Sequence, residues 1–167
     1  MSDWRTLEIY ATFIRITGEL EIVRPDRLVD AINRFGDYLQ LRNGRSEPLS
    51  IAYPVLSRPE ARMTVAKAAA VLICPVDDAG DGNPAMWREK VAQPAAITTQ
   101  AFSMIGDVHL EPRHSLQDHL ERFPRDFLPV TNISAVWVTA MDVGTHTVQR
   151  PFALLNAAAI LSFSLRG

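Results

Sequence analysis

The chain has 167 residues, of which 47% are hydrophobic and 22% are charged, a balance typical of a globular protein and not of a disordered one. The formal net charge of −2 gives no long-range field that would attract nucleic acid or an anionic membrane. No apolar run approaches the roughly 18 residues of a membrane span, and the first residues lack a signal-peptide pattern. Cys74 is the single cysteine. We therefore expect a cytoplasmic protein without an internal disulfide framework.

A repeat organises the sequence, because residues 116–132 are a recognisable copy of residues 28–43. With one extra residue near position 125, the copies align over most of the chain. The matched signature pairs are Gly18 and Gly106, Asp30 and Asp118, Phe35 and Phe123, and Asn43 and Asn132. A period longer than the roughly 20 to 50 residues of solenoid repeats predicts two fused copies of a small domain.

The repeat also predicts how the chain is divided. We expect a first repeat at residues 5–76, a linker at 77–94 and a second repeat at 95–167. A unit of about 70 residues buries only about 60% of its unfolded surface, so its stability is marginal unless it packs on a neighbour. The two copies should therefore share a core.

Each copy begins with a predicted pair of strands. Residues 7–16 are rich in β-branched and aromatic residues, and Gly18 precedes a second alternating run at residues 20–22. The second copy repeats this pattern at residues 97–110, with a glycine at Gly106. We expect each glycine to form a tight bend or a bulge between two strands.

A short helix follows in each copy. Apolar residues at i, i+4 and i+7 share one face of a helix. Both copies have such a triplet: Leu28, Ile32 and Phe35, and Leu116, Leu120 and Phe123. Ser115 and Asp118 form a capping-box pattern in the second copy, whereas the cap of the first helix would have to come from Asp26. Gly36 and Pro124 should end the helices.

The strand after each helix raises the question of a hairpin. Asn43-Gly44 alone would signal a two-residue turn. The second copy has Asn132-Ile133 at this place, and a β-branched residue resists positive φ. We therefore predict that the strand continues past the asparagine.

Each copy closes with residues 63–76 or 152–165. Alanine and leucine there favour a helix by propensity, but residues 161–165 alternate at period two. We predict two strands, joined near Lys67 in the first copy and near Asn156 in the second.

The linker begins with Asp, Gly, Asn and Pro in residues 77–84 and has no apolar period, which indicates an exposed segment. It resembles a calcium-binding loop only superficially. Ala79 interrupts the alternating ligands, and no glutamate stands at the twelfth position. A solvated linker is the favoured interpretation.

Three histidines invite a metal interpretation. His109, His114 and His119 are five residues apart, whereas helical ligand pairs normally stand at i and i+4. Solvent-facing histidines are therefore favoured over a zinc site, and we expect no metal. Cys74 lies in an apolar run without a cationic partner nearby in sequence, so it should be a buried, inert thiol.

Asp30 and Asp118 are matched carboxylates. Paired acids can carry out general acid–base chemistry if one of them is desolvated. A carboxylate in the first turn of a helix is also stabilised by the helix dipole without any catalysis. We favour the structural role.

Arg34 and Arg122 lie in the same two helices, near Asp37 and Asp126. Bracing of the helix-to-strand turn by a guanidinium–carboxylate pair is the preferred role. Alternatively, the two arginines form an anion site between the repeats, which would bind a small ligand or nucleic acid.

The second copy resembles a family of small bacterial β-rich domains of unknown function. The residues that carry the resemblance are 106–110, 116–120, 127–132 and 155–160. The family pattern is Gly-x-apolar, Leu-x-Asp-x-Leu, and Phe-Leu-Pro followed by an apolar residue and Thr. The first copy departs from it, with Gln40 in place of the proline and Arg42 in place of the threonine. The resemblance brings no catalytic residues.

These observations predict a mainly β protein with short helices: two pseudo-symmetric β-β-α-β-β-β units, each a small bent sheet or partly open barrel, packed together. No nucleophile elbow and no phosphate-binding loop is present, so we expect no cofactor and favour a non-enzymatic role over an enzymatic one. The favoured function is a protein-interaction module, scaffold or accessory subunit of a larger assembly or homo-oligomer, acting through exposed strand edges and the surface between the repeats.

Overall fold

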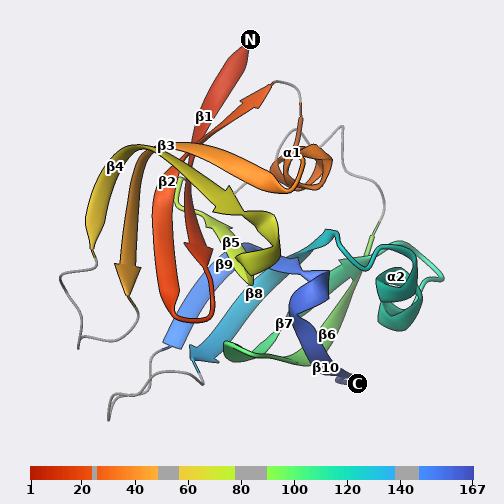
Figure 1. The fold of residues 1–167 in the computed structure, drawn as a ribbon. Coiled ribbons are helices and arrows are strands. Elements are labelled where there is room, and N and C mark those ends of the chain that lie inside the picture. The colour runs from red at the N-terminus through yellow and green to blue at the C-terminus, as the bar shows by residue number, and fades with distance from the viewer. Residues whose placement is uncertain (24–25, 49–56, 78–89, 138–146) are drawn as a thin grey trace.

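The computed structural model describes residues 1–23, 26–48, 57–77, 90–137 and 147–167. Within them, ten antiparallel strands form one sheet accompanied by two short helices (Figure 1). In chain order the elements are β1 (Ser2–Tyr10), β2 (Ile14–Val23), α1 (Leu28–Arg34), β3 (Tyr38–Pro48), β4 (Arg58–Ala66), η2 (Lys67–Ala69), β5 (Leu72–Pro75), β6 (Val91–Thr99), β7 (Phe102–Leu110), α2 (Leu116–Arg122), β8 (Phe127–Trp137), β9 (Thr147–Asn156), η4 (Ala157–Ala159) and β10 (Ile160–Leu165). The predicted class, mainly β with short helices, is confirmed. No helix in the described ranges is long and apolar enough to cross a membrane.

The strand order across the sheet is β10-β6-β7-β8-β9-β5-β1-β2-β3-β4. The first half of the chain supplies β5-β1-β2-β3-β4 and the second half supplies β10-β6-β7-β8-β9, with the same order of elements along the chain. Because β5 pairs with β9, the two separate sheets expected from the sequence are one continuous sheet. Among the described strands, β4 and β10 are left as edges, so the sheet is not closed, and the small bent sheet or partly open barrel expected for each unit is not confirmed.

Two hydrophobic cores lie against the sheet, and each contains residues from both halves. The first core, mainly from β1 to β4 and α1, also contains Phe127 and Leu154 of the second half. The second core, mainly from β6 to β9, also contains Leu72 and Cys74 of the first half. Side chains alternate between the faces of a strand, and Ile73, between these two residues, packs into the first core. The prediction of a shared interior is confirmed.

The signature asparagines lie at β-bulges. Asn43 and Asn132 have φ angles of 50° and 51°, a left-handed conformation that asparagine tolerates better than most residues. The strand register shifts at each of them, opposite Gly18 in β2 and Gly106 in β7. The strands therefore continue past the asparagines, as predicted, and the bulge alternative for the two glycines is the right one.

The turns between the paired strands lie elsewhere. β1 turns into β2 at residues 11–13, and β6 turns into β7 at residues 100–101, where no glycine or proline stands. In the second turn the hydroxyl of Thr99 accepts hydrogen bonds from the N–H groups of Ala101 and Phe102, at 3.1 and 2.8 Å. The expectation that a glycine bend separates the strands was wrong, because a backbone bond from Ala11 N–H to the Ile14 carbonyl closes the first turn and the Thr99 side chain supplies the contacts of the second.

The two helices are at the predicted places, but their caps differ. Ser115 Oγ accepts from the N–H of Asp118 at 3.0 Å, and the Asp118 carboxylate accepts from the N–H of Ser115 at 3.1 Å, so the predicted capping box is confirmed. Helix α1 has Arg27 at its N-cap without a side-chain cap bond. The prediction that Asp26 caps α1 was wrong, because its carboxylate binds Arg34 at 2.7 Å instead.

The two strands predicted at the end of each half are confirmed, whereas the predicted bounds of the linker were wrong. Short 3-10 helices, beginning at Lys67 and directly after Asn156, join β4 to β5 and β9 to β10. The end of the predicted linker, residues 91–94, belongs to β6. Residues 78–89 of the predicted linker lie outside the described residues.

Candidate functional site

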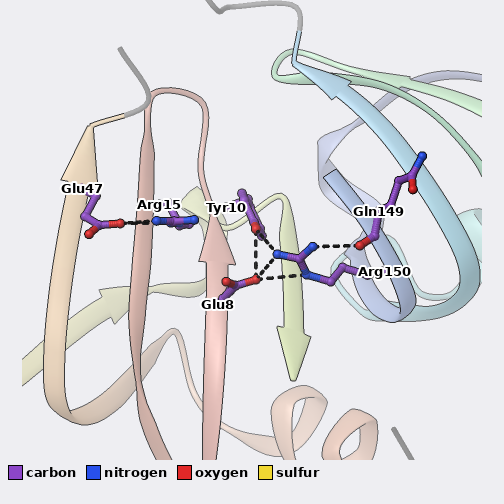
Figure 2. Close-up of polar contacts among 6 residues, drawn as sticks. All are labelled: Glu8, Tyr10, Arg15, Glu47, Gln149 and Arg150. Carbon is purple, nitrogen blue, oxygen red and sulfur yellow. Dashed lines mark hydrogen bonds and ion pairs between the residues drawn. The ribbon is translucent and has the colours of Figure 1, made fainter. Parts of the chain in front are cut away.

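Arg150 of β9 reaches past β5 to two side chains of β1 (Figure 2). Its Nε and Nη2 donate to Glu8 Oε2 at 3.1 and 2.6 Å, and Nη2 also donates to Tyr10 Oη at 3.0 Å. Tyr10 Oη donates to Glu8 Oε2 at 3.0 Å, and Nη1 of Arg150 donates to the carbonyl of Gln149 at 2.8 Å. The charge of Glu8 is therefore matched by that of Arg150, and Glu8 Oε2 accepts hydrogen bonds from both Arg150 and Tyr10.

The side chains of this cluster have a structural role. Burial, followed by the nearby Glu8 carboxylate, raises the pKa of Tyr10 to about 12. Burial also raises the pKa of Cys74, on β5 between the two strands, to about 12. Both groups keep their protons at neutral pH, so neither is an activated nucleophile. The cluster holds β9 to β1, and the prediction of a buried thiol at Cys74 is confirmed.

Two asparagines add hydrogen bonds between the two halves, at the junction where β9, β5 and β1 lie side by side. Asn33 of α1 accepts from the N–H of Phe127 at 2.7 Å and donates to its carbonyl at 3.1 Å. Asn156 donates to the carbonyl of Ala70 at 2.8 Å and to that of Lys67 at 3.3 Å. Each asparagine thus satisfies backbone groups of the opposite half, which would otherwise lose hydrogen bonds on burial.

A cleft of about 430 Å³ lies between α1 and α2. Its ionisable lining residues are Arg27, Asp30, Lys90, Glu111, His119 and Asp126. Arg27 donates to the Asp30 carboxylate from Nε at 2.7 Å and from Nη2 at 3.1 Å. Carboxylates in the lining offset the cations, so the cleft does not offer a concentrated positive charge to an anion.

The predicted anion-site residues lie outside this cleft. Neither Arg34 nor Arg122 is among its lining residues. The guanidinium of Arg34 binds both oxygens of Asp26, at 2.7 and 3.1 Å, and Nη1 of Arg122 lies 3.3 Å from Nε2 of His114. The partners predicted from the sequence, carboxylates that follow the helices, are therefore not the contacts that these two arginines make.

The matched carboxylates Asp30 and Asp118 each bind the residue three positions earlier. Asp30 accepts from Arg27 at 2.7 Å, and Asp118 accepts from Ser115 Oγ at 2.7 Å. The hydrogen bonds from Ser115 lower the pKa of Asp118, whereas a general acid at neutral pH needs a raised one. This geometry supports a structural role for the pair.

The three histidines are separated by the fold. His109 on β7 contacts Thr131 Oγ1 through Nε2 at 2.8 Å, His114 lies in a loop 3.4 Å from Glu111, and His119 is on α2. Burial lowers the pKa of His109 and of His119, which therefore stay neutral at pH 7. In the described part of the chain, no group of three or more His, Cys, Asp or Glu side chains could hold a metal ion.

The two edge strands differ in chemistry. β4 presents exposed Arg58, Glu60 and Arg62 together with a proline, and such residues keep further strands from pairing with an edge. β10 has six residues and no charge or proline among them. Two of its side chains are exposed leucines, Leu161 at 62% and Leu165 at 49%. Of the two described edges, β10 is the one open to another strand.

The sequence patterns missed the Arg150 cluster, because its members are far apart in the chain. Arg150 and Glu8 are 142 positions apart, and no motif connects them. The available signal was the run Leu7-Glu8-Ile9-Tyr10, where a charged residue stands inside an apolar strand. Such a strand is buried on both faces, and a charge within it needs a partner from another element.

No family model, curated protein or solved structure matches this chain.

Proposed function

We propose that this protein consists of two copies of one β-β-α-β-β-β unit and acts as a non-enzymatic protein-interaction module, an accessory subunit or scaffold of a larger assembly. The observation that carries the proposal is the free edge of β10, which is uncharged and carries two exposed leucines. An extended segment from a partner can add to such an edge as a further strand.

Matched details in the two halves support the duplication. The order of elements is the same, and both halves have an asparagine with positive φ at a bulge opposite a glycine. Hollows of about 280 and 360 Å³ lie beside the two bulges, at residues 43–45 and 59–61 and at residues 132–134 and 149–151. The likeness of the two bulges supports the proposal that the halves are copies of one unit.

The backbone of β10 presents free hydrogen-bonding groups at its outer side. Arg166, directly after the strand, donates its N–H to the carbonyl of Pro94 in β6 at 2.8 Å. N–H groups point to alternate sides along a regular strand, so those of Phe163 and Leu165 point away from β6, whereas Leu161 lies at a register shift between Ile160 and Ser162. Phe163 and Leu165 can form a ladder with an added strand.

Amide hydrogen exchange tests the proposal. In the native assembly, the amides of Phe163 and Leu165 should exchange at least about tenfold more slowly than in the dilute isolated chain, because a partner strand covers them. The amide of Thr64 on β4 is the control and should not change. A chain that remains monomeric with unchanged β10 exchange in the presence of its cellular proteins contradicts the proposal.

The cleft between the helices favours a second candidate, a small-ligand or nucleic-acid binding module. Its volume of about 430 Å³ is in the range of small-molecule sites, and it has Arg27, Lys90 and the neutral His119 in its lining. In this candidate, Arg34 and Arg122 attract the anionic group from outside the cleft.

Thermal-shift measurements separate the two candidates. Binding of a nucleotide or an oligonucleotide should raise the melting temperature, with a smaller rise at high salt. Arg122→Ala and Arg34→Ala should reduce that rise, while leaving the exchange of the β10 amides unaffected. Absence of any shift across nucleotides and oligonucleotides rules out the second candidate.

A further inference from the structure

We propose that the strand that pairs with β10 is β10 of a second copy of this chain, running antiparallel about a two-fold axis at Phe163. The two ten-stranded sheets then become one continuous sheet. This inference rests on the proposed function as an interaction module and names its partner.

The sequence of the edge strand is the first argument. Residues 161–165 are Leu-Ser-Phe-Ser-Leu, which reads the same in both directions. In a two-fold interface, residue i contacts residue j of the partner and residue j contacts residue i. With the axis at Phe163, Leu161 faces Leu165, Ser162 faces Ser164, and Phe163 faces its own copy. Every side chain in the pair therefore meets one of the same chemistry.

The hydrogen-bonding pattern agrees with this axis. In the regular part of the strand, the outward N–H groups belong to Phe163 and Leu165. Phe163 can therefore pair with its own copy through both of its backbone groups, while Leu161, at the register shift between Ile160 and Ser162, faces Leu165 of the other copy. Ser162 and Ser164, whose N–H groups point to β6, take the positions without hydrogen bonds between the copies.

The side chains give the pairing an apolar face. Ile160 and Phe163 are partly buried and pack against the second core. Leu161 and Leu165 are 62% and 49% exposed, and cross-strand pairing would cover both. The apolar side chains of the two β10 strands then form a row across the axis, which connects the second core of one copy with the second core of the other.

Charge explains why β10, and not β4, is the self-pairing edge. β10 carries no charged residue, so two copies meet at the axis without repulsion. β4 carries exposed Arg58, Glu60 and Arg62 together with a proline that lacks an N–H group. A strand from an unrelated protein could also add to β10, but its pairing would not need the palindrome, and the experiments below distinguish the two.

Mass measurement of the purified full chain is the first experiment. Native mass spectrometry should show a dimer of twice the chain mass of 18.6 kDa. Leu165→Pro removes one outward N–H group at an exposed position and should raise the dimer dissociation constant by about tenfold or more. Thr64→Pro is the matched control. Lys67 donates its N–H to Asp37 beside β3, so the N–H of Thr64 points to the other free edge and the dimer should persist.

Cross-linking tests the register. Ser162 and Ser164 of opposite copies form a pair without hydrogen bonds, whose Cα atoms lie roughly 4.5 Å apart, within disulfide range. Ser162→Cys and Ser164→Cys proteins should each form few cross-links alone. An equal mixture under mild oxidation should form at least about tenfold more, all between the two variants.

Each outcome decides the inference. A dimer that survives Leu165→Pro, or rapid cross-linking of Ser162→Cys with itself, overturns it while leaving an interaction module that uses another surface. A purified chain that is monomeric at all concentrations also overturns it. If β10 amides are nevertheless protected in the native assembly, the proposed function stands with a different partner strand, and if they are unprotected, both fail.

Discussion

The junction at β5 and the free edge at β10 are built from strands at the same place in the two halves, but their side chains lie in opposite environments. Both strands follow a 3-10 helix and pair with the first strand of their half. In β5, Leu72, Ile73 and Cys74 are all fully buried, whereas in β10 Leu161 is 62% exposed. An uninterrupted apolar run is typical of a strand covered on both faces, and an alternation of leucine and serine is typical of one covered on a single face.

The fourth strands of the two halves, β9 and β4, also differ in their surroundings. β9 meets β5 with the buried Leu154 and brings Arg150 to the first half. The fourth strand of the first half, β4, has exposed charged residues along most of its length. Buried apolar side chains and the Arg150–Glu8 ion pair therefore lie at the junction, and mutations there should cost much more than mutations at the edges.

The largest expected effect is that of Leu154→Ala. This side chain is fully buried and lies in the first core, although it belongs to the second half. Its truncation should lower the free energy of unfolding by about 2–5 kcal/mol. Leu161→Ala, on the exposed edge, should cost less than about 0.5 kcal/mol in the monomer at low concentration.

Urea denaturation measures both variants and also tests cooperativity. Because the cores are shared, Leu154→Ala should shift one single transition, seen equally by fluorescence and circular dichroism. Two separate transitions would show that the halves unfold independently and that the junction does not couple them.

The second largest expected effect is a loss of stability at alkaline pH, caused by two groups at the junction. Tyr10 has its pKa raised from 10.0 to about 12 by burial and by Glu8, and Cys74 has its pKa raised from 9.0 to about 12 by burial. Between these values the unfolded chain loses protons that the folded protein keeps. The corresponding stability is thus fully present below about pH 9 and is lost as pH rises to about 12.

The size of this loss follows from the shift. A shift of two pKa units corresponds to roughly 3 kcal/mol, so Tyr10 alone should remove about that much between pH 10 and 12. Chemical denaturation at stepped pH measures the slope. Tyr10→Phe should flatten it above pH 10, and Cys74→Ala should remove the part that begins near pH 9. An unchanged slope in both variants would mean that other groups cause the decline.

Arg150→Ala should cost about 2 kcal/mol. It leaves Glu8 and Tyr10 partly buried without their guanidinium partner, and hydrogen bonds to charged groups contribute roughly 1.5–3 kcal/mol when they are largely buried. Arg15→Ala is the matched control, because Arg15 binds Glu47 between β2 and β3 on a more exposed surface (Figure 2). That loss should be below about 1 kcal/mol. Equal costs would argue against a special role for the junction pair.

Several local elements could be predicted from the sequence because the two halves of the chain have matching patterns. Asn43-Gly44 alone predicts a hairpin, and only Asn132-Ile133 in the second copy shows that a strand continues there. The capping box at Ser115 was predicted from residues close in sequence. The turn at Thr99 was missed because a side-chain hydroxyl replaces the usual glycine or proline signal.

Contacts between the halves could not be predicted in this way. A repeat shows which residues correspond, but it does not show which residue of one copy touches which residue of the other. Asn33 binds the backbone of Phe127, while the position that aligns with Asn33 in the second copy is Glu121. Because this contact occurs at only one of the two matched positions, comparison of the copies gives no signal for it.

Asn33→Ala should have the smallest effect of these substitutions, and it tests the contact with Phe127 that has no counterpart in the second half. It removes two hydrogen bonds from the backbone of Phe127 and leaves a poorly solvated N–H group, at an expected cost of about 1 kcal/mol. Gln117→Ala on α2, which removes only an exposed bond to Glu121, is the control and should change stability by less than about 0.5 kcal/mol. The specific readout is amide exchange at Phe127, which should become at least about fivefold faster in Asn33→Ala and remain unchanged in the control. A loss of stability without faster exchange at Phe127 would place the cost in α1 itself, and α1 would then not be tied to β8 through this side chain.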